Sequence, residues 1–417
     1  MTSGKPSGLL AGVKVVEFSQ NAAVPQCGRL LAGMGAEVVK VEPPEGDAMR
    51  HLAALAPNEG RAYATINPGK RAIRLDLGTE NGRDVADRLI RWADIVLIGL
   101  KRVDFERYGL DWDRVRAVNP SVVSLEFTAF GPEGPEAERP GYDQLVQAAS
   151  GLGWPINRSA DGVPLPTRPA IVDFSSGGVA ATAVLAALRH AERTGEGLRV
   201  DASLLGTAMM LGTPMMASFE PDRERVAQLR EDLALMRQAG VGFDDQRELY
   251  ESRVVAMGGL FKLYVRPYRT ADGLVSIAGY SPGLKSRFHE VTGLPEPPTT
   301  AIGDDPELLA VVAEAEALFA SRTTDEWLEE LVSIGYPCSR YNTPHEAIEQ
   351  PQVEANDYVV DLTHELYGPY RTVGMPFSFS DHPTVITEPA PAFDQHTEEV
   401  LAELGYSPEQ VAAIRGD

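Results

Sequence analysis

The sequence predicts an α/β fold in which helices cover both faces of a mainly parallel sheet. Short apolar segments typical of buried strands alternate with longer amphipathic segments typical of helices, and residues 13–42 form a complete strand–helix–strand unit. Loops rich in Gly and Pro follow several of these strands. A chain of 417 residues is also too long for one ordinary core, so we expect a second domain.

The first third of the chain is expected to supply most of the sheet. The predicted strands cover residues 13–18, 37–42, 72–77, 94–99 and 122–127, with helices at 25–34 and 82–92. The turn after the first strand reads SQNAAVP, where a dinucleotide-binding fold places G-x-G-x-x-G. The sequence therefore argues against a nicotinamide cofactor.

Later segments predict a smaller second domain, in which short helices follow a hairpin. Residues 261–278 read as a hairpin closed at Asp272-Gly273, and helices are expected at 284–291, 306–319 and 324–334. Before them, Val226, Leu229, Leu233 and Met236 recur at helical spacing, which predicts a helix with a core-facing side.

The segment from Arg168 to Val200 holds the main candidate for chemistry. Ile171 and Val172 read as the end of a buried strand, with Asp173 at its exit and a helix over residues 179–193 that Gly195 ends. The unpaired N–H groups of a helix start stabilise a nearby anion. Asp173 is therefore a candidate nucleophile, and an ordinary helix cap is the alternative.

Two further groups of polar residues are candidates for ligand contact. The loop FGPEGPEAERPGYDQ follows the strand at 122–127, so Tyr142 and Asp143 are placed to reach a ligand, unless Asp143 caps the helix that follows. Lys70 and Arg71 follow an Asn-Pro-Gly turn and either meet phosphates or lie on a solvated turn.

Composition excludes several functions. A formal net charge of −22 argues against binding nucleic acid or an anionic membrane. The sequence shows no apolar run near ~18 residues and no signal-peptide core at its start, so we expect a cytoplasmic protein. None of the seven histidines has two-ligand spacing on a predicted helix, and we expect no metal. Ser281 lies in a G-x-S-x-G pattern, but Pro282 lacks the N–H that a serine hydrolase needs there.

Nine segments, in order along the chain, resemble the class III CoA-transferase family, which includes formyl-CoA transferase, carnitine CoA-transferase and the α-methylacyl-CoA racemases. They are LAGVKVVEFSQ, GAEVVKVEPPEGD, NPGKRAIRLDL, ADIVLIG with ERYGLDW, FGPEGP with RPGYDQLVQAASGL, PAIVDFSSGG, GEGLRVDASL, YRTADGLVSIAG and FDQHTEEVLAELGYS. The resemblance implies a Rossmann-like large domain from residues 1–225 and 345–417, and a smaller α+β domain from 226–344. It also implies an interlocked homodimer.

The resemblance further implies a reaction and a set of site residues. Coenzyme A moves from an acyl-CoA to a free carboxylic acid, and Asp173 is the nucleophile that carries first an anhydride and then a CoA thioester. Asp143 is expected to position the substrate or Asp173. The expected CoA contacts are Gln20, Asn21, Ala22, Ala23, Lys70, Arg71, Arg107 and Tyr142.

Departures from the family pattern leave alternatives open. Racemases of the family have a His base where this chain has Tyr142, whose unperturbed pKa of ~10 makes it a poor base. Formyl-CoA transferase has a Gln at the position of Ala22, and its glycine-rich lid is reduced here to Gly258 and Gly259. A CoA-transferase is favoured over an acyl-CoA racemase or isomerase and over a non-catalytic acyl-CoA-binding protein.

Overall fold

The computed structural model describes residues 8–154, 159–160, 162–253, 260–298, 305–382, 384 and 386–415. The chain forms two compact units, the larger from residues 1–217 and 351–417 and the smaller from 218–350. The sequence places the two boundaries at 225 and 344, and the contacts place them at 217 and 350. The chain leaves the larger unit once and returns to it.

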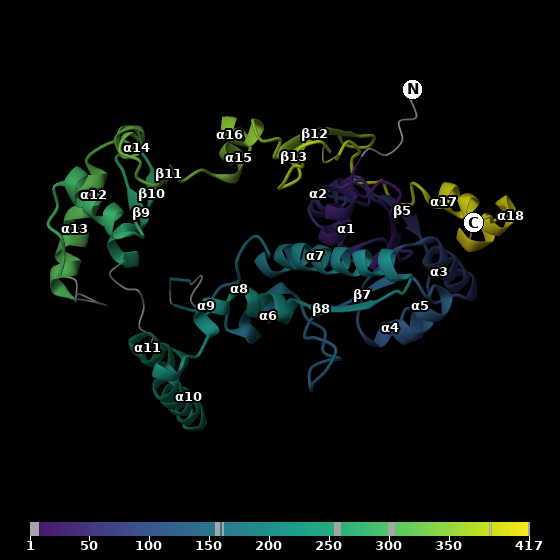
Figure 1. Ribbon diagram of the computed structural model, residues 1–417, viewed down its shortest axis with the longest axis horizontal. Coiled ribbons are helices and arrows are strands. Elements are labelled where there is room, and N and C mark those ends of the chain that lie inside the picture. Colours follow the sequence, from purple (N-terminus) through teal and green to yellow (C-terminus); the bar gives the residue numbers. More distant parts are fainter. Residues whose placement is uncertain are drawn as a thin grey trace. The chain divides into compact units, whose positions relative to one another are not determined.

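A parallel sheet of six strands forms the centre of the larger unit (Figure 1). In chain order its strands are β1 (Lys14–Ser19), β2 (Glu37–Glu42), β5 (Arg71–Arg74), β6 (Ile95–Gly99), β7 (Val123–Thr128) and β8 (Arg199–Ser203). Their order across the sheet is β5-β2-β1-β6-β7-β8. The chain therefore runs outward from β1 to β5 and then returns to the other side of β1, which creates a topological switch point between β1 and β6.

Helices cover both faces of this sheet because successive strand residues point to opposite sides. In β1, Val15 belongs to one apolar core and Val16 to the other. The first face carries α1 (Ala23–Gly33), α6 (Asp143–Ser150), α7 (Ile171–Thr194) and α8 (Leu204–Leu211). The second carries α3 (Glu80–Trp92), α4 (Val103–Tyr108), α5 (Trp112–Val118), α17 (Thr397–Glu403) and α18 (Pro408–Arg415). The expected doubly wound α/β architecture is confirmed.

The helix α7 begins eight residues earlier than the sequence analysis predicts. Ile171 and Val172 form its first turn, so the prediction of a strand there is wrong. The reason is that Val172 starts a buried face that continues at helical spacing through Ser176, Ala180 and Val184. Gly195, at φ +74°, ends the helix as expected.

Close packing against α1 places the start of α7 (Figure 1). A Cβ added at Gly177 would lie 2.5 Å from Cγ of Gln26, so only glycine permits this approach. Among the described residues α7 is the one helix long and apolar enough to cross a membrane by length and composition, which corrects the expectation that no apolar segment is long enough. Its buried face belongs to the core between α1 and the sheet.

The smaller unit contains an antiparallel sheet of β9 (Val265–Arg269), β10 (Leu274–Ala278) and β11 (Cys338–Arg340). The predicted hairpin is therefore confirmed. The helices α12 (Pro282–Thr292), α13 (Pro306–Ala320) and α14 (Thr324–Ser333) complete an aromatic core in which Phe319 stacks on Tyr268 and packs against Trp327.

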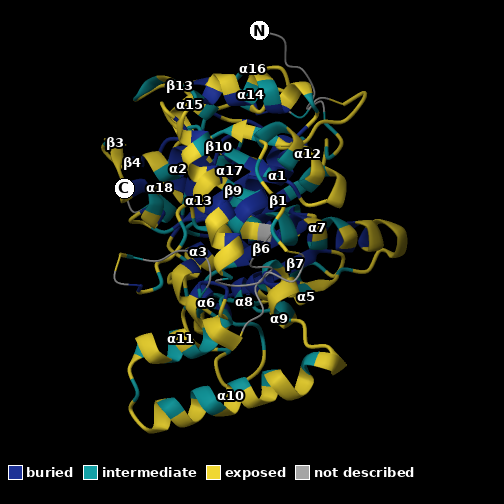
Figure 2. Ribbon diagram, turned by 90° about the vertical axis from the view of Figure 1, so that its left-hand side faces the viewer, coloured by how far each residue is buried: buried dark blue, intermediate teal, exposed yellow. Residues whose placement is uncertain are grey.

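The predicted core-facing side of α10 (Arg223–Gln238) is wrong. No residue of this helix is fully buried, and Figure 2 shows it in the colours of exposed and intermediate residues. Its apolar residues are half-exposed because α10 packs mainly against α11 (Phe243–Arg253) and not against a core.

The remaining short elements connect these layers. They are α2 (Arg61–Ile66), α9 (Thr213–Met216), α15 (Pro344–Ala347), α16 (Pro351–Glu354), β3 (Ala54–Ala56), β4 (Glu59–Gly60), β12 (Val359–His364) and β13 (Gly368–Val373), with single turns at Ala48–His51, Glu220–Asp222 and Leu260–Tyr264. Buried Arg29 of α1 donates to the carbonyl oxygens of Val373 and Gly374, and so fastens the returning chain to the larger unit.

Candidate active site

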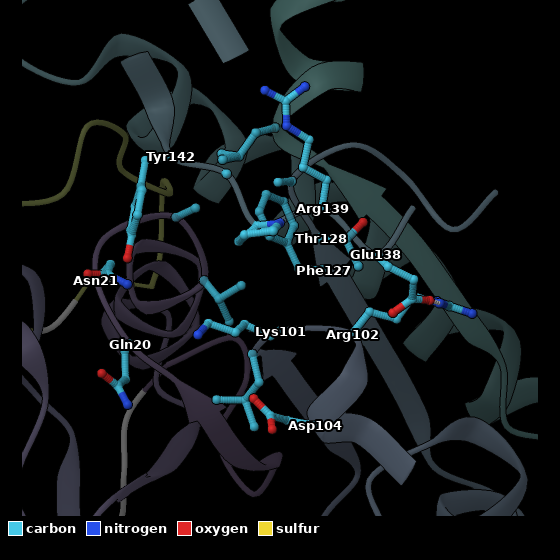
Figure 3. Close-up of a pocket in the computed structure, with 18 of the residues that line it drawn as sticks. Gln20, Asn21, Lys101, Arg102, Asp104, Phe127, Thr128, Glu138, Arg139 and Tyr142 are labelled. Carbon is cyan, nitrogen blue, oxygen red and sulfur yellow. Dashed lines mark ion pairs between the residues drawn. The ribbon is translucent and has the colours of Figure 1, made fainter. Parts of the chain in front are cut away.

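A pocket of about 410 Å³ opens at the carboxyl ends of four strands of the large sheet (Figure 3). Its lining comes from the segments that follow β1, β6 and β8 and from the end of β7, together with α7 and the loop before α6: Gln20, Asn21, Ala23, Val24, Gly99, Leu100, Lys101, Arg102, Asp104, Phe127, Thr128, Ala129, Ala137, Glu138, Arg139, Pro140, Gly141, Tyr142, Asp173 and Leu204. The pocket spans the switch point between β1 and β6, where open α/β sheets bind ligands.

Asp173 is the third residue of α7 and lines this pocket. Burial, reinforced by the nearby Asp143 carboxylate, raises its pKa to about 7. Within the described ranges, no residue forms a hydrogen bond or ion pair with the Asp173 side chain. The carboxylate is therefore half-buried at a helix start, beside a pocket, and available to a ligand.

Asp143 has a different environment, although it lies close to Asp173. It is 1% exposed, and its Oδ2 accepts the backbone N–H groups of Val172 (2.8 Å) and Asp173 (3.1 Å). The side chain of Gln147 donates to its Oδ1. Asp143 thus caps α7, since Ala170 at the N-cap position forms no side-chain bond. It does not line the pocket, and the alternative that it caps its own helix, α6, is wrong.

The turn after β1 brings three predicted CoA contacts into the pocket. Gln20, Asn21 and Ala23 line it, whereas Ala22 is buried as the N-cap residue of α1 and lies outside the lining. Asn21 has a positive φ of 67°, and its backbone N–H donates to Oδ1 of Asp47 (3.3 Å). A buried carboxylate therefore helps to hold this turn in an unusual conformation.

Tyr142 also lines the pocket and is 58% exposed. Figure 3 shows its side chain on the same side of the pocket as Asn21 and Gln20, opposite Arg102 and Glu138. Its contact with a ligand stays a prediction.

Lys70 does not line the pocket, and its surroundings argue against the predicted phosphate contact, which stays a prediction. Its ammonium group is buried and donates to Glu17 (2.8 Å), the carbonyl oxygen of Pro25 (2.7 Å) and Asn67 (2.9 Å). All three N–H bonds are used, and burial lowers the pKa of Lys70 to about 8 despite the adjacent Glu17. The lysine is part of the core beneath the turn after β1.

Arg71 and Arg107 also lie outside the pocket lining. Arg71 forms ion pairs with Glu37, Glu399 and Glu403, and so joins β5 to α17. The side chain of Arg107 on α4 is 67% exposed and pairs with Asp104, which lines the pocket. Arg71 therefore contributes to the packing of the sheet, and a contact of either arginine with CoA stays a prediction.

Three cations line the pocket that the sequence analysis did not select. Lys101 has no ion pair with any residue that the structure describes, Arg102 lies 3.4 Å from Glu138, and Arg139 pairs with Glu136 at 2.7 Å. Lys101 and Arg102 come just after β6, which ends at Gly99. Their place just after a strand of the parallel sheet is the signal that would have selected them.

Two other expectations concern sites elsewhere. Ser281 accepts the backbone N–H of Leu284 (3.3 Å) and caps α12, so the serine of the G-x-S-x-G pattern is a helix cap. Gly258 and Gly259 lie outside the described residues. Within the described ranges, no group of three His, Cys, Asp or Glu residues could hold a metal ion.

The fold and this pocket define a doubly wound α/β protein with a ligand pocket at its switch point, and comparison with known proteins identifies its family. The sequence profile of CoA-transferase family III matches residues 10–397. The chain belongs to this family.

Several curated relatives match over nearly the full chain. The succinate–glutarate CoA-transferase of Agrobacterium fabrum is 31% identical over 97% of both chains. The formyl-CoA:oxalate CoA-transferase of Streptomyces avermitilis is 30% identical over 98% of both. The probable fatty acyl-CoA transferase Rv3272 of Mycobacterium tuberculosis is 29% identical over 96% of this chain and all of its own length.

Solved structures show the same fold. The crystal structure of Rv3272 from M. tuberculosis matches with a TM-score of 0.73 at 27% identity, over 94% of this chain and 98% of the other. A CAIB/BAIF family protein from Brucella suis matches with a TM-score of 0.74 at 26% identity, over 95% and 100%. The family relationship therefore extends over both units.

Proposed function

We propose that this protein transfers coenzyme A from an acyl-CoA thioester to a free carboxylic acid, with Asp173 as the nucleophile. One observation carries the proposal: the Asp173 carboxylate lies beside the pocket, at the start of a helix, with no hydrogen bond from any described residue. Carboxylates of the core, such as Asp143, are held by several donors. A carboxylate left without donors beside a pocket is suited to attack a ligand.

The first half of the proposed reaction loads coenzyme A onto the enzyme. An Asp173 oxygen attacks the thioester carbonyl, the C–S bond breaks, and the thiolate leaves with the electron pair. The product is a mixed anhydride between Asp173 and the acyl group. The thiolate then attacks the Asp173 carbonyl carbon, which releases the first carboxylate and leaves an aspartyl-CoA thioester.

The second half delivers coenzyme A to the acceptor. The acceptor carboxylate attacks the aspartyl thioester and displaces the thiolate, which forms a second anhydride. The thiolate then attacks the acyl carbon of the acceptor, and Asp173 leaves as a carboxylate. Each step exchanges one activated acyl bond for another, so the energy of the thioester is retained as long as water is excluded.

Other residues of the pocket suit the two ends of the substrate. Lys101, Arg102 and Arg139 bring positive charge to the lining, where the phosphates of coenzyme A would bind. The helix α1 begins at the pocket without a side-chain cap, so its positive end is suited to stabilise a developing oxyanion, whereas the first N–H groups of α7 already bond to Asp143. The relatives carry names with different acids, so we propose the substrate only as an acyl-CoA and a carboxylic acid.

A proton-transfer reaction is less well supported by this site. Tyr142 occupies the position of the racemase base, and Asp143 is buried with its oxygens engaged. Asp173 alone would then have to remove and return the α-proton. The interlocked homodimer implied by the family belongs to this proposal too, and light scattering of the purified protein would test it.

The experiment that tests the function uses a panel of acyl-CoA donors, including succinyl-CoA, with several carboxylic acids as acceptors. Formation of a new acyl-CoA only when an acceptor is present is the expected result. In parallel, each donor is incubated alone in heavy water. Deuterium at the α-carbon without an acceptor would indicate a racemase, and binding of acyl-CoA without either reaction would indicate a non-catalytic protein.

A further inference from the structure

Gln147 is a buried amide on α6, one helical turn beyond Asp143, and it is 1% exposed. Both ends of its side chain are used. Nε2 donates to Oδ1 of Asp143 and to Oγ1 of Thr167 (2.9 Å), and Oε1 accepts the backbone N–H of Thr167 (3.2 Å). The side chain therefore joins α6 to the segment that leads into α7.

These bonds continue to the proposed nucleophile through Asp143. Its second oxygen accepts the backbone N–H groups of Val172 and Asp173, at 2.8 and 3.1 Å. The sequence of contacts is thus Thr167, Gln147, Asp143 and the backbone of Asp173. A movement of the Asp143 carboxylate changes the first turn of α7, and with it the direction of the Asp173 side chain.

The same contacts also have an electrostatic effect. The Asp143 carboxylate is one of the two causes that raise the pKa of Asp173, after burial itself. The distance between the Asp143 and Asp173 carboxylates depends on the donor that Gln147 supplies, and so does the charge distribution on Asp143. The reason is that a hydrogen bond to an ionised acceptor is directional and strong. An apolar side chain at this position would supply no donor.

We infer that Gln147 is a positioning residue for the proposed reaction: it holds the Asp143 carboxylate against the start of α7 and thereby fixes the direction of the Asp173 nucleophile. The inference rests on the function proposed for Asp173. A purely structural amide would contribute to stability and leave the chemistry of Asp173 unchanged, so the two roles differ in what a substitution alters.

The test compares Gln147→Leu and Gln147→Glu with Ser150→Ala as the matched control. Ser150 lies on the same helix, and among the described residues its hydroxyl bonds only to backbone groups of Gln147 and Leu152. We expect Gln147→Leu to lower kcat about 10- to 100-fold, with KM for acyl-CoA within about threefold, because a misplaced nucleophile affects the reaction more than binding. Ser150→Ala should retain the wild-type kcat.

The Gln147→Glu variant adds a readout in pH. At low pH the new carboxyl group is protonated and its O–H replaces the lost donor to Asp143. As pH rises it ionises and repels Asp143. The kcat of this variant relative to wild type should therefore fall as pH increases. An unchanged kcat and pH profile in both Gln147 variants, with only the melting temperature lowered, would overturn the inference.

Hydrogen exchange separates this inference from the proposed function, because it needs no turnover. In the full-length protein without substrate, Gln147→Leu should speed amide exchange at Val172 and Asp173 relative to wild type, and Ser150→Ala should not. Equal exchange in all three proteins would contradict the positioning role even if wild type is an active transferase. If the wild type shows no transfer but exchange is faster in Gln147→Leu, the positioning role is upheld while the proposed function fails.

Discussion

Two carboxylates meet at the start of α7 and differ in what surrounds them. Asp143 receives three N–H groups and is almost completely buried, whereas Asp173 receives none from the described residues and lies beside the pocket. The difference separates a carboxylate that the fold needs from one that the fold leaves available. We propose the chemical role for Asp173, the carboxylate that receives no hydrogen bond from a described residue.

The cations show the same contrast. Lys70 is enclosed by three acceptors beneath the turn after β1, while Lys101 lines the pocket with no ion pair to a described residue. Both are lysines that follow a turn or strand end in the sequence. Only the number of acceptors around each shows which one serves the core and which one is available to a ligand.

The largest effect is expected for Asp173→Asn, which removes the nucleophile. Transfer should fall by at least about 10³-fold, while the affinity for CoA stays within about tenfold, because the amide keeps the shape of the side chain. Steady-state transfer and equilibrium CoA binding measure the two quantities. Retained turnover in this variant would remove Asp173 from the mechanism.

The same variant has a stability readout. Since the pKa of Asp173 is about 7 in the folded protein against an ordinary value of 3.8, the folded state binds this proton more tightly than the unfolded chain. The contribution of Asp173 to the free energy of unfolding of the wild type is therefore lost as pH rises from about 4 to about 7. Asp173→Asn should melt at a higher temperature than wild type at pH 8, and the difference should vanish below about pH 4.

Lys70→Met should lower the free energy of unfolding by about 3 kcal/mol, because it leaves Glu17 buried with Lys40 as its remaining cation. Denaturant titration measures this loss. In the protein that remains folded, KM for acyl-CoA should match wild type. A selective rise in KM at full stability would restore Lys70 as a phosphate contact.

Lys101→Ala should change KM and leave stability unchanged, the opposite of Lys70→Met. We expect KM for acyl-CoA to rise about tenfold, as for a lost hydrogen bond to a charged group, with the free energy of unfolding within about 0.5 kcal/mol of wild type. The increase should shrink at high salt, because screening weakens the contact in wild type too. An unchanged KM would place the phosphates elsewhere.

The smallest effect concerns pH. The wild-type kcat should rise with pH through about 7, as Asp173 ionises to its reactive form. Asp143→Asn keeps an oxygen that accepts the N–H groups of Val172 and Asp173 but removes the negative charge that raises the pKa of Asp173. The rising limb should therefore move to lower pH, and a pH–rate profile that does not move would show that Asp143 acts through structure alone.

Much of the fold was predictable because hydrophobic periodicity is local. The five expected strands all belong to the sheet, while β8 escaped prediction because RVDAS is short and only partly buried. The strand predicted at Ile171 is wrong. The prediction gave more weight to two β-branched residues than to a helical spacing of buried residues that continues for four turns. The family motifs selected Asp173 as the candidate nucleophile, and this role stays a proposal.

The partners of polar residues were the part that sequence could not supply. Nothing near Asp143 in the chain indicates that it caps a helix beginning 28 residues later, and nothing near Lys70 indicates Glu17 as its partner. These contacts depend on how α6, α7, β1 and β5 meet in three dimensions. The pocket cations were missed for the same reason, because they become neighbours only at the edge of the sheet.

The most direct test is to trap the acylated enzyme. The protein is incubated with the acyl-CoA panel and treated with hydroxylamine, and Asp173→Asn is the control. Mass spectrometry of the intact protein and peptide mapping then locate any modification. The account predicts a hydroxamate on Asp173 with at least one donor and none in the control. Turnover with no hydroxamate, or a hydroxamate on another residue, would contradict the claim that Asp173 carries the acyl group.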